Sequence, residues 1–246
     1  MQKNQLTQYS QFLDREMHIM VYGHGGQAIL AFPTQDAMCH QLEDFGFIDH
    51  ISDYIENGRI QVFVVDTIDT ESWSFRDGNK LWRAKRQEEY YHYIVDEAVP
   101  LIRENNDTLP VTMGMSLGAN HAAINFLRRP DLFSGMLALS GVYDTDCFFD
   151  GFMDPTLYDN SPERFLPNMP SDHPYIDLYN QKKIIFCVGQ GAWEDDGVRT
   201  LRFLKSVFEE KGIRAWCDFW GFDVYHDWPW WFKQVRYFLP FLLEDR

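Results

Sequence analysis

The chain has 246 residues, of which 22 are Lys or Arg and 37 are Asp or Glu, so that its formal net charge is −15 at pH 7. This acidic balance argues against a nucleic-acid-binding protein, which needs a surplus of cations to displace the counterions of phosphate groups. Hydrophobic residues make up 45% and charged residues 24% of the chain, which is typical of a globular rather than a disordered protein. The length allows one domain, and we expect a single one over residues 1–246.

The cysteines and the apolar segments indicate the cellular compartment in which the protein is expected. The four cysteines are widely spaced and form no CxxC pair, which argues against a zinc ribbon or a thioredoxin-like redox motif. The first residues lack the apolar run of a signal peptide, and no stretch approaches the ~18 consecutive apolar residues of a membrane span. We therefore expect a cytoplasmic protein with free thiols, no metal, no cofactor, and neither membrane nor nucleic-acid partners. The sequence is compatible with a homo-oligomer.

Short apolar runs alternate with longer amphipathic stretches along the chain. The run at 18–22, joined to one at 28–32 by a Gly-rich turn, predicts an extra antiparallel strand at one edge of a sheet. Continuous apolar strands that alternate with helices are typical of an α/β fold whose mostly parallel sheet is covered on both faces. Further strands are expected at 60–65, 111–115, 135–140, 183–188 and 214–220, and helices at 42–57, 82–104, 117–128, 197–211 and 231–243.

One connection is much longer than the others. It joins the expected strands at 135–140 and 183–188 and is rich in Asp, Pro, Asn and aromatic residues. Connections of this length are uncommon and often cover a functional site. We expect the segment at about 144–180 to fold into short helices and loop that form a small cap.

The sharpest motif is Gly114-Met115-Ser116-Leu117-Gly118, a G-x-S-x-G between an expected strand and an expected helix. A serine at such a tight strand-to-helix turn is exposed above the sheet as a nucleophile. The following helix directs its free N–H groups at the same point, so the Leu117 N–H is a candidate oxyanion donor. The alternative is an inert serine that caps the helix.

Partners for this serine are expected further along the chain, because α/β-hydrolases supply the acid and then the histidine after the nucleophile. His226 is the only histidine after the last expected strand, which makes it the candidate base. Three adjacent carboxylates follow the strand at 183–188, and one of them would accept the histidine N–H. We favour Glu194 narrowly over Asp195. The remaining carboxylates, Asp196 included, suit the N-terminus of the helix at 197–211.

The second oxyanion donor should come from the loop after the strand at 28–32. Pro33 has no N–H, so the donor is Thr34 or Gln35, and we choose Gln35. The triplet at 24–26, His-Gly-Gly, is similar to an oxyanion motif of lipases. It precedes the strand at 28–32 instead of following it, so we prefer to interpret it as a turn.

Loops at the expected carboxyl ends of strands are where open α/β sheets bind ligands. Five tryptophans fall in such loops: Trp73, Trp193, Trp228, Trp230 and Trp231. We take Trp73, Trp193 and Trp228 as candidate substrate contacts. Three carboxylates follow the strand at 60–65, and we favour a solvated loop over a role at the pocket for them: Asp66, Asp69 and Glu71. His121, just inside the nucleophile's helix, is expected to pack.

Four segments together resemble a known family. They are the elbow at 114–118, Leu139-Ser-Gly141, Lys211-Gly-Ile213, and His226-Asp-Trp228 with Trp231 downstream. From about residue 17 to the end, the chain resembles the esterase (esterase D-like) family of α/β-hydrolases. That family includes S-formylglutathione hydrolases, feruloyl and acetyl-xylan esterase domains, and mycolyltransferases.

The resemblance implies an α/β-hydrolase fold with Ser116 as nucleophile and His226 as base. Two departures stand out. Phe32-Pro-Thr-Gln35 stands where relatives show a His-Gly after the third strand. The family's acid commonly appears as Gly-x-x-Asp, and here Gly191 and Glu194 have that spacing, with Glu in place of Asp.

The expected function is a serine carboxylesterase that hydrolyses short-chain acyl esters, small-molecule substrates, through an acyl-enzyme. An acyltransferase or thioesterase with the same triad is the first alternative. The second is a catalytically silent binding or assembly module, because fold alone does not confer activity.

Overall fold

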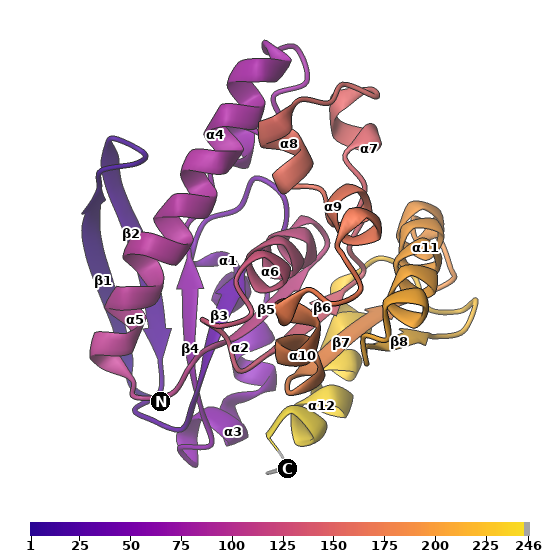
Figure 1. The fold of residues 1–246 in the computed structure, drawn as a ribbon. Coiled ribbons are helices and arrows are strands. Elements are labelled where there is room, and N and C mark those ends of the chain that lie inside the picture. The colour runs from indigo at the N-terminus through magenta and orange to yellow at the C-terminus, as the bar shows by residue number, and fades with distance from the viewer. Residues whose placement is uncertain (244–246) are drawn as a thin grey trace.

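A computed structural model describes residues 1–243 of the chain. Within them, eight strands form one mixed sheet in the order β1-β2-β4-β3-β5-β6-β7-β8 (Figure 1). The strands from β3 to β8 are parallel to one another, whereas β1 and β2 run antiparallel to their neighbours. Their bounds are β1 (Lys3–Ser10), β2 (Arg15–Tyr22), β3 (Gln27–Phe32), β4 (Ile60–Val65), β5 (Val111–Met115), β6 (Gly135–Leu139), β7 (Lys183–Val188) and β8 (Trp216–Phe219).

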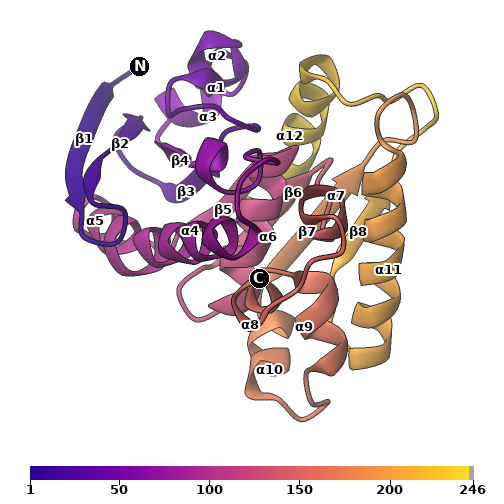
Figure 2. The same cartoon turned by 90° about the horizontal axis from the view of Figure 1, so that it is seen from above.

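Helices cover both faces of this sheet. In the view of Figure 2, α1–α3 and α12 lie on one face, and α4–α6 with α8–α11 lie on the other. The first group is α1 (Gln41–Asp44), α2 (Phe47–His50), α3 (Ser52–Glu56) and α12 (Trp228–Leu243). The rest are the 3-10 helix η1 (Asp69–Glu71), α4 (Lys80–His92), the π-helix η2 (Tyr93–Ala98), α5 (Val99–Asn105), α6 (Leu117–Arg128), α7 (Asp146–Phe149), α8 (Pro155–Asp159), α9 (Pro162–Asn168), α10 (Pro174–Asn180) and α11 (Asp195–Lys211).

Two hydrophobic cores follow from this layering. Successive side chains of a strand point to opposite faces, and β3 shows the alternation clearly. Ile29 belongs to the core beneath α1–α3 and α12, whereas Leu30 and Phe32 belong to the core beneath α4 and α6. Burial of one such large apolar side chain contributes about 1.5–3 kcal/mol. The central layer, which carries the candidate site, is therefore held rigidly from both sides, and the expected α/β fold class is confirmed.

The strand prediction missed one element. The segment 18–22 is antiparallel as expected, but it extends to Arg15–Tyr22 and pairs with β4, so its expected place at the edge is wrong. The edge is β1, which is largely exposed and carries polar residues in almost every position. Without an apolar alternation, β1 gave no periodic signal in the sequence.

Two helix predictions differ in detail. The expected helix at 42–57 is divided into α1, α2 and α3, because Gly46 adopts a left-handed φ of 77° between the first two. The expected helix at 82–104 consists of α4, η2 and α5 end to end, and the side chain of Asn79 caps it by accepting from the Trp82 N–H. The spacing of apolar residues does not reveal a short π-helical segment inside a longer helix.

The long insertion at about 144–180 folds into four short helices, α7 to α10. At the carboxyl edge of the sheet, Cys147 and Phe148 of this segment line a cavity. The following helices lie along the flanking layer instead: α8 contacts α4, α9 contacts α6 and α11, and α10 contacts β7. The covering part of the insertion is thus α7 with its flanking loop.

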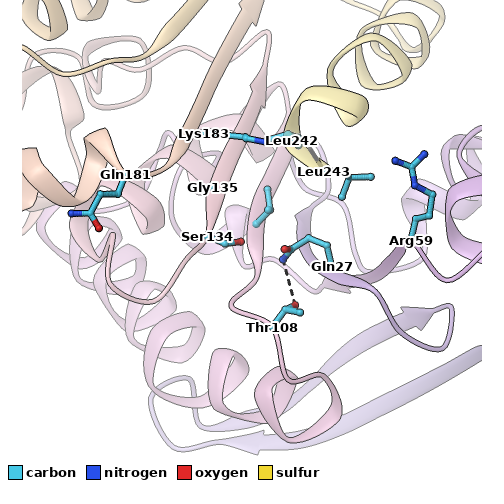
Figure 3. A pocket seen from close by; sticks show the side chains of 10 residues that line it. Gln27, Arg59, Thr108, Ser134, Gly135, Gln181, Lys183, Leu242 and Leu243 are labelled. Atoms are coloured by element: carbon cyan, nitrogen blue, oxygen red, sulfur yellow. Dashed lines mark hydrogen bonds between the residues drawn. The ribbon is translucent and has the colours of Figure 1, made fainter. Parts of the chain in front are cut away.

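The sheet also decides where a site can lie. Because β3 to β7 are parallel, the chain leaves them at one edge, at Pro33, Asp66, Ser116, Ser140 and Gly189. The opposite edge holds a separate cavity of about 420 Å³, where β3, β5, β6 and β7 begin (Figure 3). Among its described lining residues there is no histidine and no carboxylate. We therefore place the candidate active site at the carboxyl edge.

Candidate active site

Ser116 occupies the turn between β5 and α6. Its backbone has φ 56° and ψ −127°, a conformation that costs a non-glycine residue on the order of 1–3 kcal/mol. The Ser116 N–H donates to the Leu139 carbonyl at 2.9 Å, which ties this strained residue to the end of β6. The turn thus holds the hydroxyl at the carboxyl edge of the sheet.

The two glycines of the motif are needed because backbones cross there. A Cβ atom on Gly114 would lie 2.1 Å from the Gly118 carbonyl oxygen. A Cβ atom on Gly118 would lie 2.3 Å from the Pro33 carbonyl oxygen, in the loop after β3. Neither distance is compatible with a side chain, so the G-x-S-x-G pattern reflects close packing of β5, α6 and the β3 loop.

His226 bridges the serine and a buried carboxylate. Its Nε2 lies 2.8 Å from Ser116 Oγ, and its Nδ1 lies 3.2 Å from Glu194 Oε2. The network fits the tautomer with the proton on Nδ1, which leaves Nε2 free to accept from the serine hydroxyl. The His226 N–H donates to the Ala192 carbonyl at 3.1 Å, so the loop before α12 is fastened to the loop after β7.

The carboxylate of Glu194 is 1% exposed and held by further donors. Its Oε1 accepts from Ser140 Oγ at 2.6 Å and from the Gly189 N–H at 3.4 Å. Ser140 Oγ in turn accepts from Trp231 Nε1 at 3.0 Å. In the sequence, Ser140 and Trp231 carry only the resemblance to the family. Their contribution here is to fix the carboxylate that faces the imidazole.

The neighbouring carboxylates point elsewhere. Asp195 is the first residue of α11 and is exposed, and Asp196 forms an ion pair with Arg199 at 3.0 Å. Both lie in the first turn of α11, where negative charge complements the helix dipole. Of the three candidates, Glu194 is thus the one within hydrogen-bond distance of His226.

Two residues that the sequence predicts as oxyanion donors, Leu117 and Gln35, both line the cavity beside Ser116. Leu117 begins α6, where the first N–H groups have no partner inside the helix. In the loop after β3, the Thr34 N–H donates to Gln41 Oε1 at 2.8 Å, which leaves Gln35 as the donor that borders the cavity. The His24-Gly25-Gly26 triplet lies between β2 and β3, at the opposite edge of the sheet.

The three tryptophans lie in different surroundings. Trp193 is 90% exposed, has a left-handed φ of 66° and lines the cavity beside Ser116. Trp228 stacks on Phe45 with 4.8 Å between ring centroids and does not line that cavity. Trp73 is 1% exposed and donates to Gln87 Oε1 at 2.7 Å. It therefore packs in the core, where it cannot make the substrate contact expected of it.

The cavity at this edge has a volume of about 390 Å³. A second nucleophile, Cys147, lines it, but burial and the nearby Asp144 raise the pKa of this thiol to about 11. The thiol is therefore protonated at neutral pH, which makes it a poor nucleophile. The described lining residues are Gln35, Arg76, Ser116, Leu117, Asn120, Ser140, Val142, Cys147, Phe148, Trp193, Asp196 and His226.

The loop after β4 is not the solvated loop that the sequence led us to expect. Asp66 and Asp69 are 2% and 1% exposed. Asp66 accepts from two backbone N–H groups, and Asp69 lies 2.8 Å from the buried His121 Nε2. Glu71 pairs with Arg86 at 2.9 Å. Sequence reasoning missed these contacts because they join residues from separate elements.

Residues 1–243 contain neither a candidate metal site nor a candidate membrane-spanning helix. No three His, Cys, Asp or Glu side chains in this range gather where they could hold a metal ion. No helix in the same range combines the length and apolar character needed to cross a membrane.

Solved structures share this fold at low sequence identity. A ferulic acid esterase is 15% identical with a TM-score of 0.73, over 98% of this chain and 97% of that one. A fluorophosphonate-binding serine hydrolase of Staphylococcus aureus is 12% identical with a TM-score of 0.70, over 99% of both chains. An S-formylglutathione hydrolase of Agrobacterium tumefaciens is 12% identical with a TM-score of 0.71, over 98% of this chain and 94% of that one.

Sequence comparisons settle the family. The curated proteins yield no match to this chain. The model of the family described as "Putative esterase" matches residues 10–241, nearly the whole chain. The resemblance noted from the elbow and the histidine segment is thereby confirmed. The chain belongs to this esterase family and is a carboxylic ester hydrolase with an α/β-hydrolase fold.

Proposed function

We propose that the chain is a serine carboxylesterase that hydrolyses short-chain acyl esters through an acyl-enzyme on Ser116, His226 and Glu194. One observation carries the proposal: His226 lies between Ser116 Oγ, at 2.8 Å, and the buried Glu194 carboxylate, at 3.2 Å. These are the contacts that a general base needs to activate a serine and to keep the correct tautomer.

In the first half of the reaction, His226 Nε2 takes the proton of Ser116 as its Oγ attacks the ester carbonyl. Glu194 stabilises the imidazolium that forms, and the N–H groups of Leu117 and Gln35 bind the oxyanion. His226 then returns the proton to the departing alcohol, and the acyl group remains on Ser116. In the second half, His226 activates water, which releases the acid and restores the serine.

The size of the cavity supports small substrates. A volume of about 390 Å³ is near the lower end of the ~300–1,000 Å³ of small-molecule sites. Trp193 stands exposed at this cavity and is the proposed substrate contact among the tryptophans. A cytoplasmic location stays part of the proposal, consistent with the four free cysteines among the described residues.

The first test is labelling and turnover. The wild type should react with a fluorophosphonate probe and hydrolyse p-nitrophenyl acetate. Ser116→Ala should abolish labelling, and His226→Ala should lower kcat by several orders of magnitude. A folded wild type that neither labels nor turns over would remove the esterase proposal in favour of a silent binding module. The contact between His226 and Ser116 weighs against that alternative.

A transferase with the same triad is the remaining candidate, because Trp193 offers a flat surface to an acceptor at the cavity. Product analysis in the presence of added alcohols, sugars and thiols would distinguish the two. Free acid as the sole product supports hydrolysis, whereas an acylated acceptor at low concentration identifies an acyltransferase.

A further inference from the structure

Two buried titratable side chains next to the active site take no part in the proposed reaction. His121 projects from α6 four residues after Leu117, on the same face of the helix. Asp69 begins η1, after β4. Asp69 Oδ1 lies 2.8 Å from His121 Nε2, and both side chains are 1% exposed. Burying a carboxylate destabilises the fold unless its oxygens accept hydrogen bonds. The donors that Asp69 accepts from therefore show which parts of the structure it holds in place.

The second oxygen of this carboxylate faces the loop after β3. Asp69 Oδ2 accepts from the Asp36 N–H at 3.1 Å. Asp36 has a left-handed φ of 60°, a conformation that persists only where the surroundings impose it. The hydrogen bond from Asp36 to Asp69 is such a constraint, because it fixes the peptide plane between Gln35 and Asp36.

The loop is anchored on the other side of Gln35 as well. The Thr34 N–H donates to Gln41 Oε1 at 2.8 Å, and Gln41 Nε2 donates to Thr34 Oγ1 at 2.7 Å. The N–H of Gln35 thus lies between two peptide planes that are each held by a side chain. Its direction is set by Gln41 before it and by Asp69 after it.

His121 connects this anchor to the nucleophile's helix. Its ring stacks on Phe32 with 5.8 Å between centroids and meets Tyr90 edge-on at 5.0 Å. Both aromatic residues are fully buried, so the imidazole has no room to turn away from Asp69. The same helix carries the Leu117 N–H at its first residue. His121 and Asp69 therefore join the two halves of the oxyanion hole.

We propose that Asp69, held by His121, is a positioning residue that aligns the Gln35 N–H with the Leu117 N–H for the oxyanion. This inference rests on the proposed esterase reaction. Neither side chain lines the cavity beside Ser116. Their effect is to keep two donors at a fixed separation, and donors that are fixed beforehand stabilise the transition state more than the bound ester.

The test compares Asp69→Ala with Asp66→Ala. Asp66 is a matched control, because it is equally buried and accepts from the backbone N–H groups of Cys39 and His18, both at 3.0 Å. Loss of a complete oxyanion donor lowers kcat about 10²–10³-fold. For a misaligned donor we expect Asp69→Ala to lower kcat roughly 10–100-fold, with KM within about threefold of the wild type.

A second measurement separates alignment from general damage. A trifluoromethyl ketone forms a tetrahedral oxyanion on the serine, so its inhibition constant should rise by the same factor as kcat falls. Asp66→Ala should lower the melting temperature but leave both quantities within about threefold. Asp69→Asn should restore most of the activity, because its amide can accept from Asp36 and donate to His121.

The outcomes are distinct. If the wild type is active and Asp69→Ala leaves kcat and ketone binding unchanged, or if Asp66→Ala reduces both as strongly, the positioning role is refuted. If Asp69→Ala does not fold, His121→Phe fills the aromatic cage without a hydrogen bond to Asp69, and wild-type kcat and ketone binding in that variant would refute the role equally. If the wild type itself is inactive, the esterase proposal falls and this inference falls with it.

Discussion

Glu194→Gln changes the proposed triad by a single atom and keeps the volume of the side chain. Ser140 Oγ and the Gly189 N–H now donate to Glu194 Oε1, so the amide oxygen of Gln would occupy that position. The amide NH₂ would then face His226 Nδ1 in place of the carboxylate oxygen at 3.2 Å. Because an NH₂ group donates, Nδ1 has to accept, and the proton of the imidazole moves to Nε2.

That tautomer cannot accept the proton of Ser116, whose Oγ lies 2.8 Å from Nε2. A carboxylate-to-amide change at a triad acid lowers kcat about 10⁴-fold, or about 5.4 kcal/mol of transition-state stabilisation. The hydrogen bond from Ser140 survives, so the free energy of unfolding should change by less than about 1 kcal/mol. Activity and stability should therefore separate clearly in this variant.

The assay is steady-state hydrolysis of p-nitrophenyl acetate together with thermal melts of the same samples. Asp195→Asn is the matched control. Asp195 is adjacent to Glu194 and exposed, and the substitution removes one negative charge, as Glu194→Gln does. It should keep kcat within about twofold of the wild type, as expected of a surface change. Equal rates for the two variants, or a larger loss in Asp195→Asn, would refute the assignment of Glu194.

Three further variants test the framework. In Gly118→Ala the new methyl group would lie 2.3 Å from the Pro33 carbonyl oxygen, so urea titration should show a loss of about 1–3 kcal/mol together with lower kcat. Ser140→Ala leaves the buried proposed acid without its 2.6 Å donor, and we expect kcat to fall about tenfold with a loss of about 1–3 kcal/mol in stability. Burial acts to raise the pKa of Glu88, but the hydrogen bonds and the charge of Arg128, together with the hydrogen bond from Asn160, outweigh it and lower that pKa. A lowered pKa stabilises the fold above the ordinary value of 4.5, so in pH-dependent melts Glu88→Gln should be less stable than the wild type at pH 7, and this difference should shrink as the pH falls below 4.5.

Much of the site's framework was predictable because its signals are local. The G-x-S-x-G motif combines an apolar strand, a tight turn and a helix within a few residues, so Ser116 and Leu117 were placed on their elements from sequence alone. His226 followed from chain order, and Glu194 from its spacing to Gly191. Such patterns can be recognised without knowledge of the tertiary contacts, because they lie in short segments or in the order of the segments along the chain.

The supporting contacts were not predictable, since they join elements that are far apart in the chain. Asp69 and His121 are separated by 52 positions, and Ser140 and Glu194 by 54. Each is an ordinary residue in its local sequence, and only the parallel arrangement of β4, β5, β6 and β7 brings them together. Trp73 shows the same limit, because its loop position gave no sign that the packing of α4 and α7 would bury it.

The hydrogen bond from Trp231 to Ser140 has a consequence for the order in which the molecule becomes active. Trp231 lies on α12, the last helix of the described chain, whereas Ser140 lies at the end of β6. During synthesis, the sheet from β1 to β7 emerges from the ribosome well before the histidine and the tryptophan that complete the site. The residues that complete the proposed site thus come last in the chain, on or just before the helix whose side chains also close one of the two cores, so docking of α12 and assembly of the site are one event.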